Sequence, residues 1–572
     1  MTFQSSLSWA SQGWRGPFFA ALLALIAGLP GVFAMPPLDR DESRFAQATA
    51  QMLETGDYVV IRYQDEPRFK KPVGIHWLQA LSVSTVSAVE DREIWAYRLP
   101  SLLGAMLAAG ACAWGATAFF GAPAGLIAGA LLGSSLLLST EAFIAKTDAV
   151  LCGLIVLAMV ALARIYGAVR GGPTVGWRSR LLFWLGLSGA ILVKGPVGPM
   201  VVGLAVIALV AWERKIDWLR GLGLSWGPIL LLALVGPWAW AVTVATDGAF
   251  WSTAIMGDLA PKLAGGHETH GAPPGYHLLG LSLLAFPMTL LVPAALVVGW
   301  TRRHEPGIRF ALCWLIPAWI VFELTPTKLV HYPLPLYGAL AWLAAAALRE
   351  PLGRAARLSG AVLAAISGLI LAGICFVLLS QFGAAADVTA AAAAGGLLAA
   401  AGLVGGFMLA SRAPRGAVVT AMALTVLGHG ALAAGLAPGL APLWSSARVA
   451  RILESERLLP RQGMAPSPVA VTGYAEPSLV FALGTPTLLG DAADAAQAIA
   501  TFRPAVVEAA QETAFRAALD ARGLQVRMVR QVEGLNYSNG RPVRLRIYAN
   551  DAPRPAPPTA TALAPLTQEA AP

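Results

Sequence analysis

Acidic and basic side chains crowd together in the segment from Pro37 to Trp77, which directly follows an apolar run of the chain. Asp41 and Glu42 begin this cluster, and Arg44 follows three residues after Asp41. Side chains with this spacing share one face of a helix, so Asp41 and Arg44 would face the same site. A carboxylate tuned by a nearby arginine can act as a general base. The alternative is that these acids cap a helix, because acidic residues favour the first helical turn.

Basic residues gather a little later at Arg68, Lys70 and Lys71. Three cations so close together can bind the oxygens of a phosphate group. The same cluster could instead be attracted to lipid headgroups or simply be solvated. Lys194 is a further cation in an apolar stretch. A lysine there either extends to the membrane surface or serves a site.

A third group lies in the segment TPTKLVHYPLPLYG, which contains Lys328, His331 and Tyr332. Lys328 and Tyr332 are one helical turn apart and would face the same site. Pro333 and Pro335 would distort the start of a helix here. A lone histidine in such a segment is more often a hydrogen-bonded polar residue than a metal ligand.

Metal-binding patterns are weak in this chain. His267, Glu268 and His270 have a spacing that could hold a metal, but no helix is predicted there to orient them. Cysteines occur only in apolar stretches, so neither a disulfide framework nor a thiolate zinc site is predicted. They are Cys112, Cys152, Cys313 and Cys375. We expect no metal and no other cofactor.

The elements that must position these residues are membrane-spanning helices. The chain has 572 residues, of which 56% are hydrophobic and 13% charged, and its mean hydropathy is +0.63. An apolar helix of about 20 residues crosses roughly 30 Å of hydrocarbon and satisfies its own backbone groups there. The expected fold is an all-α polytopic membrane domain with about thirteen spans. These lie near residues 17–35, 95–119, 122–140, 148–168, 181–195, 196–212, 222–245, 276–300, 308–325, 329–348, 358–381, 390–410 and 416–438.

Lysine and arginine residues concentrate in alternate loops between these spans. Such loops lie on the cytoplasmic side of a membrane, which places the N-terminus inside and the loop 36–94 outside. The segment 17–35 is expected to be an uncleaved anchor. The net charge of +9 then reflects topology, and no nucleic-acid partner is expected. The candidate residues all map to the outer side, whereas a transporter would place some of them at mid-membrane.

Composition predicts three parts of the chain. They are a transmembrane domain at 1–440, a small soluble periplasmic α/β domain at 441–550 and a disordered tail at 551–572. The outer loop 36–94 is expected to carry surface helices near 42–53 and 73–86. The α/β domain is expected to contain strands at 467–473, 505–507 and 541–549, a helix at 511–522 and a turn at 536–540.

Six motifs in a fixed order give the chain a family resemblance. They are DRDESRFAQATAQMLETGDYVV, RFKKPVGIHWLQAL, KTDAVL, LVKGPVGP, PWAWAV and TKLVHYPLPLYGALA, between residues 35 and 345. The chain resembles bacterial integral-membrane glycosyltransferases of the GT-C type. The pattern is most similar to the lipid A aminoarabinose transferases and the wider protein O-mannosyltransferase-like family. The resemblance implies that a sugar is transferred from a polyprenyl-phosphate donor outside the inner membrane.

The resemblance also implies roles for residues of this sequence. Asp41 matches the family's essential aspartate, Arg44 its nearby arginine, and Lys71 the lysine that contacts the donor phosphate. Asp148 matches an acid of the second outer loop. The predicted site therefore comprises Asp41 and Asp148 as catalytic residues, Arg44, Lys71, Lys262 and Lys328 as ligands of the donor phosphate, and Glu42, Lys70, His270, His331 and Tyr332 as substrate-binding residues.

Three positions differ from the aminoarabinose transferase pattern. Lys70 replaces an acidic residue linked to metal in that family, Arg68 replaces an aromatic residue, and Lys262 stands where an arginine is common. These differences predict a more basic pocket. They indicate a donor more anionic than aminoarabinose, such as a uronic acid.

The function expected from these observations is inverting transfer of a hexose or pentose from a polyprenyl-phosphate donor. The acceptor would be a lipid resembling lipid A, a glycan or a protein, on the periplasmic side of the bacterial inner membrane. The alternative is a transporter or flippase of a lipid-linked sugar. A membrane sensor is a weaker alternative, because no cytoplasmic output domain is predicted.

Overall fold

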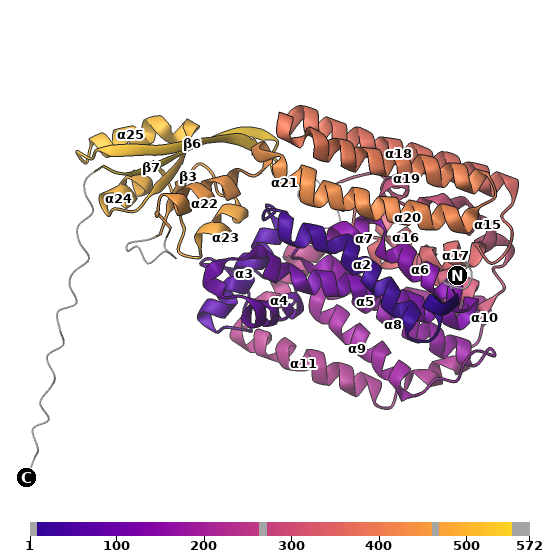
Figure 1. The fold of residues 1–572 in the computed structure, drawn as a ribbon. Helices are drawn as coiled ribbons and strands as arrows, with labels where there is room; N and C mark the ends of the chain where they lie inside the picture. The colour runs from indigo at the N-terminus through magenta and orange to yellow at the C-terminus, as the bar shows by residue number, and fades with distance from the viewer. Residues whose placement is uncertain (1–7, 262–270, 460–467, 552–572) are drawn as a thin grey trace, which may run out of the picture. The chain divides into compact units, whose positions relative to one another are not determined.

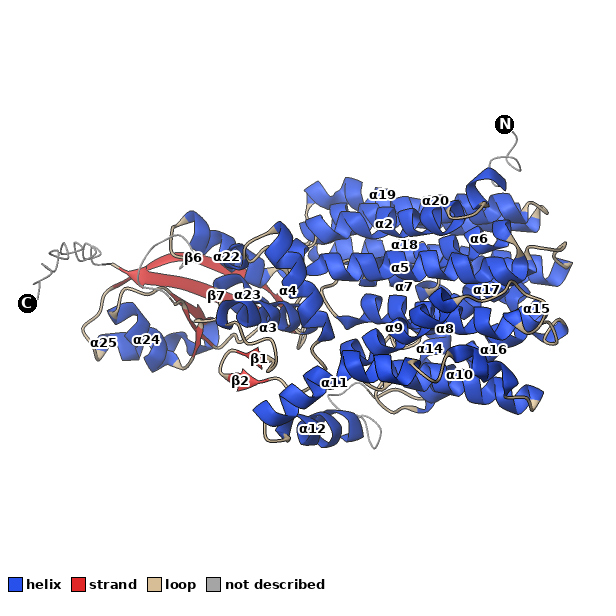
Figure 2. Ribbon diagram, turned by 90° about the horizontal axis from the view of Figure 1, so that it is seen from below, coloured by secondary structure: helices blue, strands red, loops and turns tan. Residues whose placement is uncertain are grey.

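The structure is a computed structural model that describes residues 8–261, 271–459 and 468–551. The chain divides into two compact units, 1–441 and 442–572 (Figure 1). In its described part, the first unit is built of helices with one short hairpin, β1 (Arg62–Tyr63) and β2 (Glu66–Pro67). The second unit contains a five-stranded sheet (Figure 2).

The first unit has eight helices, among the residues described, that are long and apolar enough to cross a membrane. They are α2 (Arg15–Ala34), α5 (Ile94–Phe120), α8 (Thr147–Ala168), α11 (Gly227–Ala245), α16 (Pro306–Leu324), α18 (Arg354–Phe382), α19 (Val388–Ala410) and α20 (Pro414–Ala431). A ninth span arises if α14 (Tyr276–Leu284) and the helix that ends with α15 (Val292–Thr301) form one span bent by 112°. The predicted membrane fold is confirmed, whereas thirteen spans are not.

The other predicted spans are interrupted, short or more charged. α6 (Ala122–Gly133) and α7 (Leu136–Glu141) divide the segment predicted as one span at 122–140. The break falls at Ser134 and Ser135, whose hydroxyls donate to the carbonyls of Ala130 and Leu132 and so compete with the helix. α10 (Val197–Glu213) and α17 (Tyr337–Ala347) are shorter than a full span, and α9 (Trp177–Lys194) carries two arginines at its start.

The loop 36–94 forms two helices at the positions where two helices were predicted. α3 (Asp41–Thr55) begins with two acidic residues, which favour the first turn of a helix. It ends at Gly56, whose φ of 72° is the left-handed conformation that glycine adopts without strain. α4 (Gly74–Val86) follows the hairpin. α3 and α4 pack against each other, and Ala48 and Met52 of α3 share an apolar core with Ile61 and Val73 of the loop and with side chains of α11 and α12 (Ala249–Ser252).

A close crossing of α5 and α8 fixes the start of α8. A Cβ atom added to Gly104 would lie 2.6 Å from the Cα atom of Val150, and one added to Gly153 would lie 2.5 Å from the carbonyl oxygen of Gly104. Both positions therefore require glycine for the backbones to approach this closely. Small residues at helix crossings are the usual basis of packing between membrane helices. This crossing holds Asp148, in the first turn of α8, close to the N-terminal half of α5.

The segment before α17 differs from the prediction. A span was predicted at 329–348, with Lys328 and Tyr332 one helical turn apart, but α17 begins only at Tyr337, after the short 3₁₀ turn Leu334–Leu336. Pro333 and Pro335 explain the delay, because proline lacks the backbone N–H that a helix interior needs. Residues 325–333 therefore form an irregular segment that is free to bend into a site.

The second unit is a mixed sheet with helices. The strand order is β4-β3-β5-β7-β6, with β3 parallel to β4 and β5, and β7 antiparallel to β5 and β6. The strands are β3 (Ala470–Thr472), β4 (Leu488–Leu489), β5 (Ala505–Glu508), β6 (Val526–Asn536) and β7 (Arg541–Asn550). The helices are α22 (Ser445–Ser455), α23 (Pro477–Leu483), α24 (Ala492–Ala500) and α25 (Glu512–Asp520). The predicted α/β architecture, including the turn between β6 and β7, is confirmed.

Candidate active site

Charged and polar side chains from six segments of the first unit line one cavity of about 330 Å³. This volume is in the range of pockets that bind small molecules, about 300–1,000 Å³. The segments are the start of α3, the loop before α4, the loop before α8, the end of α9, the π-helix Thr253–Leu259 and the irregular segment before α17. The charged and polar lining residues are Asp39, Arg40, Asp41, Arg44, Arg68, Lys70, Lys71, Lys146, Thr147, Asp148, Lys194, Asp258, Thr327, His331 and Tyr332.

Asp41 and Arg44 both line this cavity from the first turn of α3, as their spacing predicted. The Asp41 side chain is exposed to the cavity. Arg68, from the neighbouring loop, lies over the ring of Phe45, with its guanidinium carbon 5.5 Å from the ring centroid. This contact holds a third charged group beside Asp41. The loop 36–94 thus places a carboxylate among arginines.

Lys71 reaches the cavity from the loop before α4. Its Nζ donates a hydrogen bond to Asp258 Oδ2 over 2.9 Å. Asp258 is 7% exposed and lies in the π-helix Thr253–Leu259. The pair joins two segments that are distant in the sequence at the cavity wall. Lys70 lies next to Lys71 in the same lining, with its side chain exposed.

Asp148 is the centre of a buried charged cluster. Its Oδ1 accepts a hydrogen bond from Lys194 and lies 3.5 Å from His331 Nε2, and its Oδ2 lies 3.5 Å from Lys146 Nζ. Lys146 Nζ also lies 3.0 Å from Glu141 Oε1 and 3.3 Å from His331 Nδ1. Two lysines therefore face two carboxylates around one imidazole. The motif KTDAVL places both Lys146 and Asp148 here, at the start of α8.

Protonation within this cluster follows from burial and pairing. Burial lowers the pKa of His331 well below its usual value, although Asp148 opposes the effect. Burial alone would lower the pKa of Lys146, but Glu141 and Asp148 outweigh it and hold that pKa above its usual value. Lys146 then donates to Nδ1 of a neutral His331, which leaves the proton on Nε2, facing Asp148. Burial raises the pKa of Glu141 to about 7, against the attraction of Lys146.

Glu42 was predicted to bind substrate, but it does not line the cavity. Its carboxylate accepts hydrogen bonds of 2.8 Å from Arg98 Nε and Nη2, and both side chains are fully buried. It also accepts from the backbone N–H groups of Leu38 and Ala145, each over 2.8 Å. Arg98 donates further to the carbonyls of Val32 and other residues at the end of α2. Glu42 therefore ties the α2–α3 connection to α5 and to the loop before α8.

Of the remaining predicted residues, some line the cavity, one does not, and others lie outside the described residues. Tyr332 and His331 line the cavity, and Lys194 Nζ lies 5.6 Å from the centroid of the Tyr332 ring. Lys328 is 4% exposed and donates to the carbonyl of Thr325 over 2.7 Å, so its side chain is not among the lining residues. Lys262 and His270 lie outside the described residues, as do His267 and Glu268.

Several lining residues were not in the predicted site, among them Lys146, Lys194 and Asp258. Lys194 was noted from the sequence as a lysine in an apolar stretch, with service of a site as one of two interpretations, and the same signal, the cost of a lysine in apolar surroundings, could have identified Lys146. Asp258 has no comparable signal, because a single acid in an outer loop is ordinarily solvated. Among the described residues, no group of three His, Cys, Asp or Glu side chains could hold a metal ion.

Comparisons with known proteins agree with the sequence resemblance. The chain is 30% identical over 337 residues to the undecaprenyl phosphate-alpha-4-amino-4-deoxy-L-arabinose arabinosyl transferase of Pseudomonas paraeruginosa, covering 57% of this chain and 59% of that protein. It is 29% identical over 362 residues to the enzyme of the same name from Pseudomonas aeruginosa, covering 61% and 63%. The chain thus spans about three fifths of the length of the curated relatives it matches. No family model matches the chain.

The solved structures give the fold. The crystal structure of ArnT from Cupriavidus metallidurans bound to undecaprenyl phosphate matches with a TM-score of 0.74 at 20% identity, over 93% of this chain and 97% of that one. The apo form of the same protein matches with a TM-score of 0.72. The chain is therefore an integral membrane protein with the GT-C fold. Its resemblance to the aminoarabinose transferases is confirmed, and the transporter interpretation gains no support.

Proposed function

We propose that the chain is an inverting glycosyltransferase that moves a sugar from a polyprenyl-phosphate donor to a lipid acceptor, such as lipid A, or to a glycan or protein. The observation that carries this proposal is the cavity in which Asp41 and Asp148 lie among lysines and arginines, on a membrane fold shared with ArnT. A phosphate-linked sugar needs cations at its phosphate and a carboxylate near its anomeric carbon. The lining supplies both.

The reaction is a single displacement at the anomeric carbon. The acceptor oxygen forms a bond to that carbon while the bond from the carbon to the phosphate oxygen breaks, and its electron pair leaves with polyprenyl phosphate. Asp41 accepts the proton of a hydroxyl acceptor and stabilises the positive charge that develops on the sugar. A phosphate acceptor has no proton to lose, and Asp41 then only stabilises the positive charge that develops on the sugar. Attack opposite the leaving group inverts the configuration.

The cations bind and stabilise the departing phosphate. Lys71 and Arg44 are the proposed ligands, and Lys70 lies beside them. Asp148 orients Lys146 and Lys194 toward the cavity, because its carboxylate contacts both ammonium groups. We propose that these cations, rather than a metal ion, offset the charge on the phosphate. A lining with this excess of basic groups would repel a divalent cation.

The lining also suggests which donor is preferred. Seven basic side chains and four carboxylates line the cavity, so the formal charge is +3 with His331 neutral. Arg68 and Lys70 contribute two of these cations at the positions that differ from the family pattern. A donor sugar that carries its own carboxylate would be attracted to this excess. We therefore propose a uronic acid or another anionic sugar as donor.

The proposed location of the reaction is the periplasmic face of the bacterial inner membrane. In the loop 36–94, which forms much of the cavity, acidic residues outnumber lysines and arginines, whereas the loops at the opposite ends of the helices are rich in arginine and carry few acidic residues. The positive-inside rule then places the cavity outside the cytoplasm. The second unit, which follows the last membrane helix, would lie on the same side.

A transfer assay with purified protein tests this function. The protein in detergent is incubated with undecaprenyl-phosphate sugars of three kinds, neutral, amino and uronic, together with lipid A, and the products are measured by mass spectrometry. The proposed transfer needs no sealed vesicle, whereas transport does. Transfer with any of these donors supports the activity, and a preference for the uronic donor supports the proposed substrate. Transfer only of a neutral or amino sugar would exclude the anionic donor but retain the reaction.

A further inference from the structure

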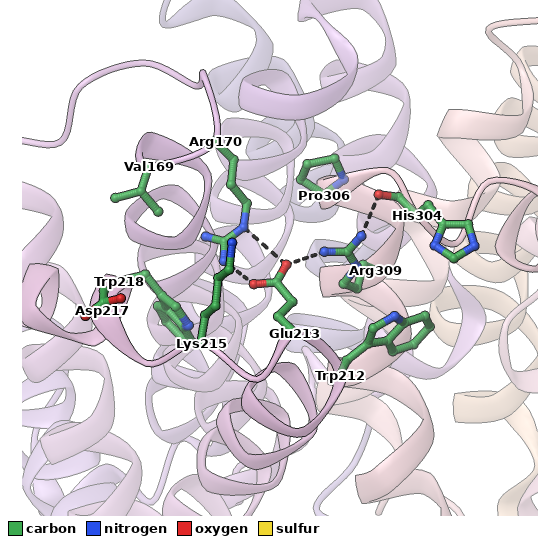
Figure 3. A pocket seen from close by; sticks show the side chains of 10 residues that line it. All are labelled: Val169, Arg170, Trp212, Glu213, Lys215, Asp217, Trp218, His304, Pro306 and Arg309. Carbon is green, nitrogen blue, oxygen red and sulfur yellow. Dashed lines mark hydrogen bonds and ion pairs between the residues drawn. The ribbon is translucent and has the colours of Figure 1, made fainter.

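A second cavity of about 740 Å³ lies at the opposite ends of the helices that carry the candidate active site. Its lining is formed by Val169, Arg170, Trp212, Glu213, Lys215, Asp217, Trp218, His304, Pro306 and Arg309 (Figure 3). One group of these residues follows the end of α8, and a second group surrounds the end of α10. The remaining residues lie just before α16 or in its first turn. None of them has a role in the proposed transfer reaction.

Helix length places the two cavities on opposite sides of the membrane. Asp148 lies at the start of α8 and Arg170 two residues beyond its end. The 22 residues of this helix rise about 33 Å, at about 1.5 Å for each residue. This distance is close to the hydrocarbon thickness of roughly 30 Å. The second cavity is therefore at the level of the lipid headgroups on the other surface.

The centre of this cavity is a carboxylate shared by two arginines. Arg170 and Arg309 both donate to Glu213, and Tyr166 donates its hydroxyl to the same carboxylate over 2.5 Å. Figure 3 shows the two guanidinium groups approaching Glu213 from opposite sides. One carboxylate offsets one of the two guanidinium charges. An excess positive charge therefore remains, with side chains that are only 16% exposed.

Two buried donors at this cavity have no hydrogen-bond partner among the described residues. They are Arg309 Nε and the indole N–H of Trp218, whose side chain is 2% exposed. Buried polar groups are normally hydrogen-bonded, so an unpartnered donor beside a cavity calls for an acceptor from elsewhere. Lys215 adds a further, exposed cation to the lining. Asp217 adds a carboxylate, the second in the lining after that of Glu213. The site as a whole is suited to an anion with several acceptor oxygens.

The surroundings favour a lipid over a free ion. Val169 and Trp212, which line the cavity, are 64% and 42% exposed, and the adjacent Ile216 is 63% exposed. Apolar and tryptophan side chains at this level are typical of the membrane interface. A volume of about 740 Å³ exceeds what a single phosphate ion would fill. Arginine-rich pockets between membrane helices are suited to the phosphate of a lipid headgroup.

We infer that this cavity binds the headgroup phosphate of an anionic phospholipid, with Arg309 and Lys215 as its cationic ligands. The inference does not rest on the proposed function. The bound lipid would join the ends of α8, α10 and α16, which extend from this cavity to the candidate active site. The group bound in the cavity would be a phosphate ester. The test below distinguishes binding of a lipid from binding of free phosphate.

Native mass spectrometry of the full-length protein tests this inference. The protein in detergent is titrated with phosphatidylglycerol, with phosphatidylcholine and with inorganic phosphate, and the retained adducts are quantified. We expect phosphatidylglycerol to be retained several-fold more than phosphatidylcholine. In Lys215→Gln the retention of phosphatidylglycerol should fall about fivefold, as expected for one cation near a lipid surface. The matched control is Arg214→Gln, which removes a neighbouring exposed cation outside the lining and should leave retention unchanged.

A second variant, expected to increase lipid binding instead of decreasing it, keeps the test informative if Lys215→Gln folds poorly. Asp217→Asn removes an exposed carboxylate from the lining and should raise the retention of phosphatidylglycerol about fivefold. Equal retention of the two lipids by the wild-type protein would overturn the inference. So would an equal loss in Arg214→Gln and Lys215→Gln, or displacement of phosphatidylglycerol by inorganic phosphate at equal concentration.

Discussion

Lys71 and Asp258 form a hydrogen-bonded ion pair of 2.9 Å across 187 residues of sequence. The pair connects the loop before α4 to the π-helix Thr253–Leu259 at the wall of the cavity. In the proposed reaction Lys71 binds the donor phosphate. Asp258 therefore engages the same ammonium group that the donor requires, and the two anions would compete for it.

Replacing Lys71 by alanine should mainly weaken donor binding. A charge-assisted hydrogen bond contributes about 1.5–3 kcal/mol, so Kd for undecaprenyl phosphate should rise roughly 10- to 100-fold. The measurement is isothermal titration of the detergent-solubilised variant. Arg62→Ala, an exposed arginine of the same loop outside the lining, is the matched control and should bind like the wild type. An unchanged Kd in Lys71→Ala would remove Lys71 from the phosphate site.

Asp258→Asn should have the opposite effect on the same binding constant. The substitution removes the competing carboxylate, and partly exposed ion pairs contribute up to about 1 kcal/mol, so Kd should fall about threefold. In a Lys71→Ala background the gain should disappear, because the two substitutions act on one contact. A weaker affinity in Asp258→Asn would mean that Asp258 itself supports the donor.

Glu42→Gln should destabilise the protein. Removing one partner of a fully buried ion pair costs about 3 kcal/mol or more, and here it also leaves Arg98 without its counter-charge. The measurement is the Tm in detergent, compared with Glu66→Gln, which alters an exposed glutamate of the hairpin. Equal values of Tm for the two variants would contradict the role assigned to the Glu42–Arg98 pair.

Stability should fall with acidification because of His76. Burial lowers its pKa to about 3, with a smaller contribution from Arg68. Thr49 donates to Gln79 over 2.7 Å and so accepts from His76 Nδ1 over 2.8 Å, which places a proton on Nδ1. A histidine whose pKa is lowered in the folded state contributes stability above about pH 6.5 that is progressively lost as the pH falls toward 3.

At pH 5 this loss should reach about 2 kcal/mol, since each pKa unit corresponds to about 1.4 kcal/mol. His76→Asn retains a donor near the position of Nδ1 but does not titrate. Its Tm should therefore decrease less between pH 7 and pH 5 than that of the wild-type protein. Parallel decreases in the two proteins would show that His76 is not the titrating group.

The local elements could be predicted from the sequence, and the reason is periodicity. The alternation of Val543, Leu545 and Ile547 with polar residues predicted β7, and these three side chains are buried in one core. The charged start of α3 likewise predicted that Asp41 and Arg44 share a face. Such patterns depend on the geometry of one element only.

Relationships between distant segments could not be predicted in this way. Glu42 and Asp41 are adjacent and both acidic, yet one is buried against Arg98 on α5 and the other is exposed to the cavity. Nothing local distinguishes them, because the difference depends on which face of α3 meets the start of α5. The pairing of Lys71 with Asp258 depends in the same way on tertiary packing.

The most direct test of the proposed enzyme is the turnover of Asp41→Asn. The amide is similar in size to the carboxylate but neither accepts the acceptor's proton nor stabilises positive charge on the sugar. Sugar transfer to lipid A should fall about 10²- to 10⁴-fold. Donor affinity and Tm should remain those of the wild-type protein and of Asp65→Asn, an exposed control outside the lining. Near-normal turnover of Asp41→Asn would contradict the assignment of Asp41 as the catalytic carboxylate.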